Sequence, residues 1–163
     1  MSHSFEPTDW NRLKVFPLES RESLSRVEDV LAKAGTPPAP LPGFQALLMD
    51  ECARAVASAK SRGAAVILIY GAHLLRNGAA PVIANMCAKG WITHLATNGA
   101  GTIHDWEFAW LGRSTENVED NVRQGTFGAW DETSRNIHLA LMAGALHGEG
   151  YGQAKRRVPE NRG

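Results

Sequence analysis

Two glycine-bounded loops contain the polar residues of this sequence that are best placed for chemistry. The first, residues 71–78 (GAHLLRNG), follows the apolar run 64–70 (AAVILIY). The second, residues 98–105 (NGAGTIHD), follows the run 92–97 (ITHLAT). Each run is typical of a β-strand, and ligands of open α/β sheets bind where parallel strands end. We therefore expect the two loops to lie side by side at one edge of a sheet and to form a single pocket.

The second loop has the components of a phosphate or dinucleotide cradle. Gly99 and Gly101 allow a ligand to approach the backbone closely. The helix expected to follow offers unpaired N–H groups and the positive end of its dipole. The sequence NGAG is not the GxGxxG fingerprint, however, and a tight turn that requires positive φ explains the same glycines. Nucleotide binding and a simple turn therefore stay open as alternatives.

Histidines in and near these loops are the candidates for proton transfer. His104 and Asp105 fall in the first turn of the helix after the second loop, where an imidazole can polarise a carbonyl or move a proton. The alternative is that Asp105 is only a helix-start charge and that His104 packs or faces solvent. His73, directly after a strand, is equally open to both interpretations. His94 lies inside a strand and is expected in the core.

Metal binding is not predicted. A ligand cluster would have to form across the two loops, and the sequence has no HxxxH or CxxC spacing to support one. The residues that such a cluster would contain are His73, His104, Asp105 and Glu107. Cys52 and Cys87 are expected on apolar helix faces, where they serve packing.

The elements that position the loops follow from apolar spacing. Two strands joined by a helix imply parallel pairing with a right-handed crossover, and the first strand is expected to be buried on both faces. The fold class is therefore α/β, with helices on both faces of the sheet. Because two strands are few, the chain is expected to be part of a larger fold or to complete its sheet by association. Helices are predicted over residues 23–34, 44–61, 81–88, 102–111, 114–122 and 131–146.

Composition limits the classes of function. The 163 residues contain 44% hydrophobic residues, enough for a core, and 17 basic residues balance 17 acidic ones. A net charge of zero argues against a protein that tracks nucleic-acid phosphates. The longest apolar run is far shorter than the roughly 20 residues of a membrane span. With two cysteines and no visible targeting segment, we expect a cytoplasmic protein that binds neither nucleic acid nor membrane.

Three segments are expected along the chain. Residues 1–43 form an arm, a short helix and a proline-rich connector (TPPAPLPG, residues 36–43). Residues 44–149 form the α/β nucleotide-binding-like core. Residues 150–163 form a basic tail that is expected to fray.

Most of the core resembles a known family. The segment 66–112 (VILIYGAHLLRNGAAPVIANMCAKGWITHLATNGAGTIHDWEFAWLG) and the segment 126–135 (TFGAWDETSR) are similar to the deoxyhypusine synthase-like family, particularly its bacterial branch. The arm 12–21 (RLKVFPLESR) also resembles that branch. The resemblance implies a Rossmann-like NAD-binding fold, partial in this chain, and a homo-oligomer, usually a tetramer with active sites between subunits.

The family's activity gives the corresponding expectations. Its members use NAD to oxidise spermidine and transfer an aminobutyl group to a protein lysine, or to a small amine. The resemblance assigns NAD binding to two groups of residues: Ala72, His73, Leu74, Leu75 and Arg76 in the first loop, and Asn98, Gly99 and Ala100 in the second.

Departures from the family pattern change the expected substrate and activity. Two adjacent acids of the synthases align with Ile103 and His104, so a cationic polyamine loses its carboxylates. His104 becomes the candidate general acid/base, with Asp105 as its orienting residue or as an independent polar contact. The family's imine-forming lysine has no counterpart before Gly163, and without it covalent transfer has no nucleophile. The expected alternative is a truncated, non-catalytic nucleotide-binding or assembly module.

Overall fold

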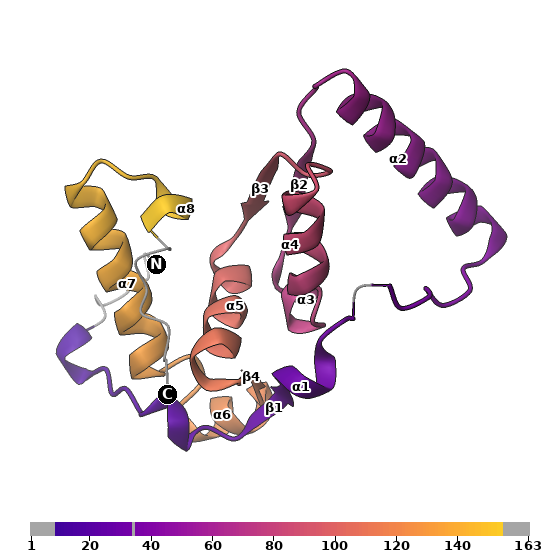
Figure 1. Ribbon diagram of the computed structural model, residues 1–163. Coiled ribbons are helices and arrows are strands. Elements are labelled where there is room, and N and C mark those ends of the chain that lie inside the picture. The colour runs from indigo at the N-terminus through magenta and orange to yellow at the C-terminus, as the bar shows by residue number, and fades with distance from the viewer. Residues whose placement is uncertain (1–8, 34, 155–163) are drawn as a thin grey trace, which may run out of the picture. The chain divides into compact units, whose positions relative to one another are not determined.

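The computed structural model describes residues 9–33 and 35–154 of the 163-residue chain (Figure 1). The fold is mixed α/β, and its strands form two sheets of two strands each. The chain divides into two compact units: unit 1 contains residues 1–22 and 116–159, and unit 2 contains residues 23–115 and 160–163. The boundary expected after residue 43 falls inside unit 2.

Unit 2 holds both predicted loops and the strands before them. Its elements are β1 (Ser23–Arg26), α1 (Val27–Val30), α2 (Gly43–Ser61), β2 (Ile67–Tyr70), α3 (Ala72–Arg76), α4 (Ala80–Ala88), β3 (His94–Thr97), α5 (Gly99–Leu111) and β4 (Arg113–Glu116), which runs to the unit boundary.

The strands β2 and β3 pair in parallel, as predicted. Their register places Ile67 opposite His94 and Tyr70 opposite Thr97, so both strands end at the same edge. The helix α4 between them has Pro81 in its first turn, where a missing N–H costs no hydrogen bond. The strands β2 and β3 form a parallel sheet of two strands, which is smaller than the sheet of a Rossmann-like fold.

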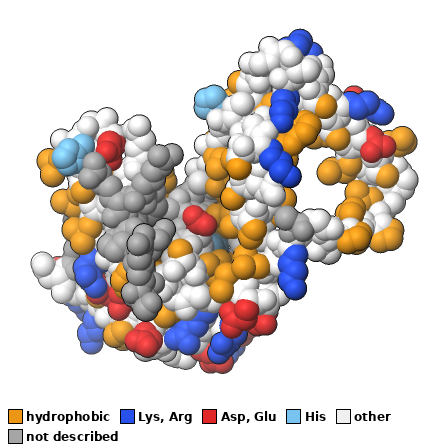
Figure 2. All heavy atoms as spheres, viewed as in Figure 1, with side chains coloured by type: hydrophobic (Ala, Val, Ile, Leu, Met, Phe, Trp, Pro, Cys, Tyr) orange, Lys and Arg blue, Asp and Glu red, His pale blue; other side chains and the backbone are white. Residues whose placement is uncertain are grey.

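The expected burial of the first strand on both faces is wrong for the described residues. Ile67 is 59% exposed and Ile69 is 79% exposed. His94, expected in the core, is exposed as well. A two-stranded sheet has too little neighbouring structure to cover both faces, so apolar side chains of the strand stay exposed. Apolar side chains also gather on the surface of α2 (Figure 2), whose exposed members include Phe44 and Leu47.

Several predicted elements differ from those observed in unit 2. The helix expected over residues 23–34 is the strand β1 followed by the single turn α1, because β1 pairs with β4 and the N–H of Val27 donates to the carbonyl of Gly112 at 2.8 Å. The first loop is largely the helix α3. Five residues are too few to show a helical apolar period, so the bracketing glycines suggested a loop.

The start of α5 also corrects the sequence analysis. The helix predicted from residue 102 begins at Gly99, and its cap is Asn98, whose Oδ1 accepts a hydrogen bond from the N–H of Gly101 at 3.1 Å. The glycines at 99 and 101 are therefore helical residues rather than a turn with positive φ. The left-handed residue is Gly112, with φ of 69°, at the other end of the helix.

Unit 1 is helical, with an extended N-terminal arm. Its elements are η1 (Trp10–Arg12), η2 (Leu18–Ser20), α6 (Val118–Gln124), α7 (Asp131–Leu146) and α8 (Tyr151–Ala154). The helix expected over residues 114–122 is wrong in its first half, because residues 113–116 form β4. The helix predicted over 131–146 is confirmed as α7, with an ion pair between Arg135 and Asp131 at 3.0 Å.

The arm docks at the start of α7. Phe16 forms a parallel bridge with Trp130, donating to Ala129 O at 2.8 Å and accepting from the N–H of Asp131 at 2.9 Å. Leu18, which is 1% exposed, packs in the core of unit 1. The tail predicted over 150–163 begins with α8, and residues 155–163 lie outside the described residues. Among the described residues, no helix has the length and apolar character to cross a bilayer.

Candidate functional site

The ends of β2 and β3 bring the two predicted loops together. Tyr70 and Thr97 are paired as the last residues of the two strands, and Gly71 and Asn98 directly follow them. A Cβ placed on Gly71 would lie 3.8 Å from Asn98 Nδ2. Both α3 and α5 start immediately after these residues. The predicted juxtaposition of the two loops is confirmed, and we call this edge the strand-end site.

The first turn of α5 packs closely against the strand-end site. A Cβ on Gly101 would collide with Thr97 Oγ1, so the helix reaches this position only because residue 101 has no side chain. Gly99 differs, because no atom lies within 4 Å of a Cβ placed there. Gly99 and Ala100 are both exposed, so a ligand can approach the backbone N–H groups at the positive end of this 13-residue helix.

Tyr70 is a polar member of the strand-end site that the sequence analysis missed. Burial raises the pKa of its phenol, and the nearby negative charge of Asp105 raises this pKa further, while a hydrogen bond with Thr97 acts in the opposite direction. The phenol therefore keeps its hydrogen at neutral pH and can donate to a ligand. Its place as the last residue of a strand, just before a candidate loop, was the signal available.

A second polar group in unit 2 contains His104. Its Nδ1 lies 2.8 Å from Ser114 Oγ, which donates to Glu107 Oε2 at 2.5 Å. Ser114 is 0% exposed and Glu107 is 1% exposed. Serine has one hydroxyl hydrogen, and this hydrogen is used on Glu107, so Ser114 accepts from His104. Nδ1 therefore carries a hydrogen, and in the neutral imidazole Nε2 is the acceptor.

The two candidate catalytic residues have different surroundings. Successive helical residues point about 100° apart. Asp105 acts electrostatically on Tyr70, whereas the Nδ1 edge of His104 faces Ser114 of β4. Ser114 and Glu107 thus form an orienting pair for His104 that the sequence analysis did not find. Ser114 lies 10 positions from His104 on another element, so no local spacing could reveal this contact.

The resemblance assigns NAD binding to five residues of the first loop. In the structure these residues form α3 and differ in their exposure. His73, Leu74 and Arg76 are exposed, and Ala72 is half-buried. Leu75 is 6% exposed, so its side chain belongs to the core of unit 2. The side chains of His73, Leu74 and Arg76 are therefore the parts of this loop that are most accessible to a ligand.

Other chemistry-bearing groups were also singled out in the sequence. Within residues 9–33 and 35–154, no three histidine, cysteine or carboxylate side chains are grouped as a metal site. Cys87 is half-buried on α4, but Cys52 is exposed on α2, so the packing role expected for Cys52 is wrong in this structure. Trp106 and Trp110 stack with ring centroids 5.4 Å apart, as their spacing on one helix face predicts.

Comparisons with known proteins add no assignment. No protein-family model matches the chain, nor does any curated protein or solved structure. The similarity to the deoxyhypusine synthase-like family therefore stays a prediction.

Proposed function

We propose that the strand-end site binds NAD in a deoxyhypusine synthase-like protein. The observation that carries this proposal is the parallel register of Tyr70 and Thr97, which brings the starts of α3 and α5 to one edge. Dinucleotides bind α/β sheets at such an edge, with phosphates at a helix N-terminus. The further strands of a Rossmann-like sheet would join this pair from a larger fold or from another copy of the chain.

The accessible groups fit an anionic dinucleotide. The open space at Gly99 allows phosphate oxygens to reach the N–H groups of Gly99 and Ala100. Arg76, exposed at the end of α3, supplies a positive charge, and the protonated phenol of Tyr70 supplies a donor. When bound, NAD supplies a hydride acceptor. The residues of this chain bind the dinucleotide, orient it and transfer protons.

In a catalytic protein, His104 is the proton-transferring group. Its Nδ1 hydrogen is donated to Ser114, so in the neutral imidazole the proton-accepting nitrogen is Nε2. The imidazolium formed by that step is stabilised through Ser114 by the buried carboxylate of Glu107. The proposed reaction is transfer of an aminobutyl-type group to a small amine or a protein lysine, in a homo-oligomer.

A second candidate function is a non-catalytic nucleotide-binding or assembly module. The observation that favours it is the exposure of the strands, because Ile69 is 79% exposed and Leu95 is 48% exposed. Apolar strands of a parallel sheet are normally covered on both faces. Association with further strands and helices would bury them, whether or not the complex is catalytic.

The test is titration of NAD into the protein by calorimetry, together with the solution mass. Gly99→Leu places a large side chain in open space over the N–H groups of α5 without disturbing packing, so it should abolish saturable binding. Ala109→Leu, an exposed position on the same helix, is the matched control and should bind as the wild type does. Equal binding by both variants, or none by the wild type, contradicts the proposal.

Turnover distinguishes the two candidate functions. Binding with turnover that His104→Ala removes supports the enzyme, and binding without turnover supports the non-catalytic module.

A further inference from the structure

Unit 2 contains a cavity that the proposed function does not use. Its volume is about 320 Å³, at the lower end of the range of small-molecule sites. It lies between the chain segment that follows α1 and one face of α4, and none of its described lining residues belongs to the strand-end site. These lining residues include Lys33 and Lys89 but no aspartate or glutamate, so the described lining is positively charged.

Backbone contacts hold the wall that contains Lys33. The N–H of Ala32 donates to the carbonyl of Gly78 at 3.0 Å, and there is no room for a Cβ on Gly78. The N–H of Thr36 donates to the carbonyl of Lys33 at 3.1 Å. Gly35, which also lines the cavity, has a φ of 89°, a conformation that favours glycine. Because these hydrogen bonds use only the backbone, they leave the ammonium of Lys33 and the hydroxyl of Thr36 to the cavity.

The other wall is a face of α4 that changes from apolar to basic along the helix. The residues of this face are spaced by three and four positions. They are Val82, Asn85, Met86 and Lys89. Val82 and Asn85 are half-buried, and Met86 is 37% exposed. A ligand along this face would therefore contact apolar side chains at one end and an ammonium at the other.

Lys60 offsets the negative end of the α4 dipole beside this cavity. Carbonyl groups at a helix C-terminus carry partial negative charge, which disfavours an anion. The carbonyl of Lys89 accepts from Nζ of Lys60 at 2.5 Å, and the carbonyl of Met86 accepts from the N–H of Trp91 at 2.8 Å. The ammonium of Lys60 also lies 4.0 Å from the ring centroid of Trp91. A third positive charge is thus fixed at the end of α4.

The charge and the apolar surface of the lining select the ligand class. A phosphate monoester carries close to two negative charges at neutral pH, and lysine binds phosphate as a compact point charge. We propose that this cavity binds a small phosphate monoester with an apolar substituent. The phosphate lies between Lys33 and Lys89, where the hydroxyl of Thr36 supplies a further donor. The substituent packs on Val82 and Met86.

Three small anions test this assignment. n-Butyl phosphate carries both parts, methyl phosphate lacks most of the apolar chain, and pentanoate keeps a chain but carries one charge. Each is titrated into the full chain in phosphate-free buffer while the assigned methyl signal of Met86 is followed by NMR. We expect saturable binding of butyl phosphate, with affinities about 10-fold weaker for pentanoate and at least about 5-fold weaker for methyl phosphate. Either weaker probe binding as tightly as butyl phosphate, or no binding of butyl phosphate at millimolar concentration, overturns the proposal.

A matched pair of lysine variants separates the cavity from general charge effects. Lys33→Gln should weaken butyl phosphate binding about 10-fold, and the backbone bond of residue 33 to Thr36 survives the change. Lys14→Gln removes the same charge from an exposed lysine that does not line the cavity, and it should leave binding unchanged. Equal effects of the two variants, or no effect of either, contradict the assignment.

Gly99→Leu distinguishes this cavity from the strand-end site. Gly99 does not line the cavity, so this variant should give the same butyl phosphate titration of the Met86 signal as the wild type. Loss of that titration in Gly99→Leu would assign the phosphate to the strand-end site and overturn the proposal. The titration does not require NAD, so the cavity can be confirmed even where the wild type fails to bind the dinucleotide.

Discussion

The hydroxyl of Ser114 donates to the carboxylate of Glu107 at 2.5 Å, and neither side chain has meaningful contact with solvent. This buried bond determines the state of a third residue, because it leaves the Ser114 oxygen only as an acceptor for His104. The strand β4 and the helix α5 are thereby joined through the side chain with the strongest case for proton transfer.

Ser114→Ala should change both the tautomer of His104 and the stability of unit 2. Nitrogen NMR of the imidazole in the wild type should show the hydrogen on Nδ1, and the variant should lose this preference. The free energy of unfolding should fall by about 1–3 kcal/mol, because a buried carboxylate loses a donor. Ser134→Ala, at an exposed position of α7, is the control and should change neither. A wild-type hydrogen confined to Nε2 would contradict the assigned network.

The glycines at the start of α5 should respond differently to the same change. Gly101→Ala forces a methyl group against Thr97 and should destabilise the protein by about 1–3 kcal/mol, the usual result of overpacking. Gly99→Ala adds the methyl group to open space in a helical residue, so it should be neutral or stabilising by up to about 1 kcal/mol. Denaturant unfolding measures both, and similar losses would show that α5 does not pack on the strand ends as described.

Tyr70 should make stability depend on alkaline pH. Its pKa in the folded protein is raised above the ordinary value of 10.0, so the native state holds the phenolic hydrogen more tightly than the unfolded chain does. The stabilisation is fully present below pH 10 and is lost as pH rises through the folded pKa. Tyr70→Phe should remove this alkaline loss. In that variant Tyr151 is the remaining tyrosine, so its tyrosinate absorbance provides the reference titration.

The charge of Asp105 contributes to the same pKa. Asp105→Asn should therefore lower the pKa of Tyr70, because the negative charge disfavours the phenolate. The shift is measured by tyrosinate absorbance in the presence and absence of the substitution. An unchanged or increased pKa would show that Asp105 does not face the strand-end site.

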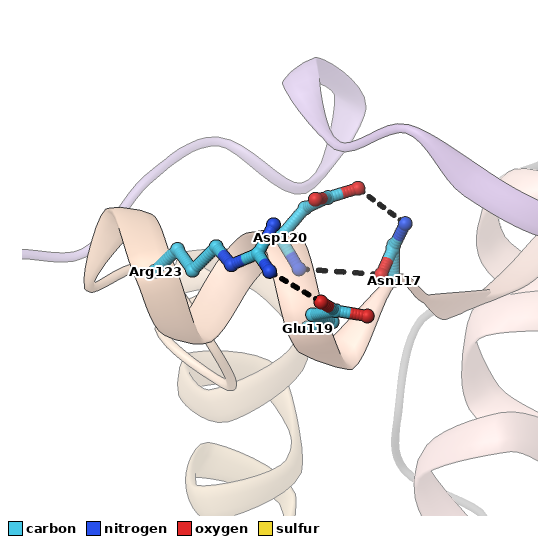
Figure 3. Close-up of polar contacts among 4 residues, drawn as sticks. All are labelled: Asn117, Glu119, Asp120 and Arg123. Atoms are coloured by element: carbon cyan, nitrogen blue, oxygen red, sulfur yellow. Dashed lines mark hydrogen bonds and ion pairs between the residues drawn. The ribbon is translucent and has the colours of Figure 1, made fainter.

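Glu116 is a half-buried carboxylate of unit 1 whose removal should be costly. It accepts from Asn121 Nδ2 at 2.7 Å, from the indole of Trp130 at 3.0 Å and from the N–H of Gly128 at 3.2 Å. Glu116→Ala should cost about 2–4 kcal/mol, since several charge-assisted bonds are lost together. Glu119→Ala breaks one exposed ion pair with Arg123 (Figure 3) and should cost less than about 0.5 kcal/mol. Tryptophan fluorescence follows both unfolding transitions.

Local patterns predicted the strand-end site better than they predicted its surroundings. The two apolar runs identified β2 and β3, and the short crossover between them required parallel pairing, so the meeting of residues 71 and 98 followed from topology. The helices α2, α4 and α7 were clear because each is long enough to show a period or has a proline at its start. The helices α2 and α4 each begin one residue earlier than predicted, and the bounds of α7 agree with the prediction.

Long-range contacts account for the failures. The segment 23–34 has a helical apolar spacing, but its first four residues form β1, because β4 offers them backbone partners. Ser114 gives no local signal, since its partners lie on α5. The cavity in unit 2 joins Lys33 and Thr36 to α4, which are about fifty positions apart in the sequence, so neither its lining nor its charge could be inferred from spacing.

Amide chemical-shift mapping during an NAD titration tests the central claim most directly. If the strand-end site binds the dinucleotide, the largest shifts should fall together on residues 71–76 and 98–100, with saturation at one concentration for both groups. The variant Gly99→Leu should abolish both sets of shifts at once. Shifts in one group alone, shifts confined to unit 1, or an unchanged spectrum would contradict the claim that the ends of β2 and β3 form a single nucleotide site.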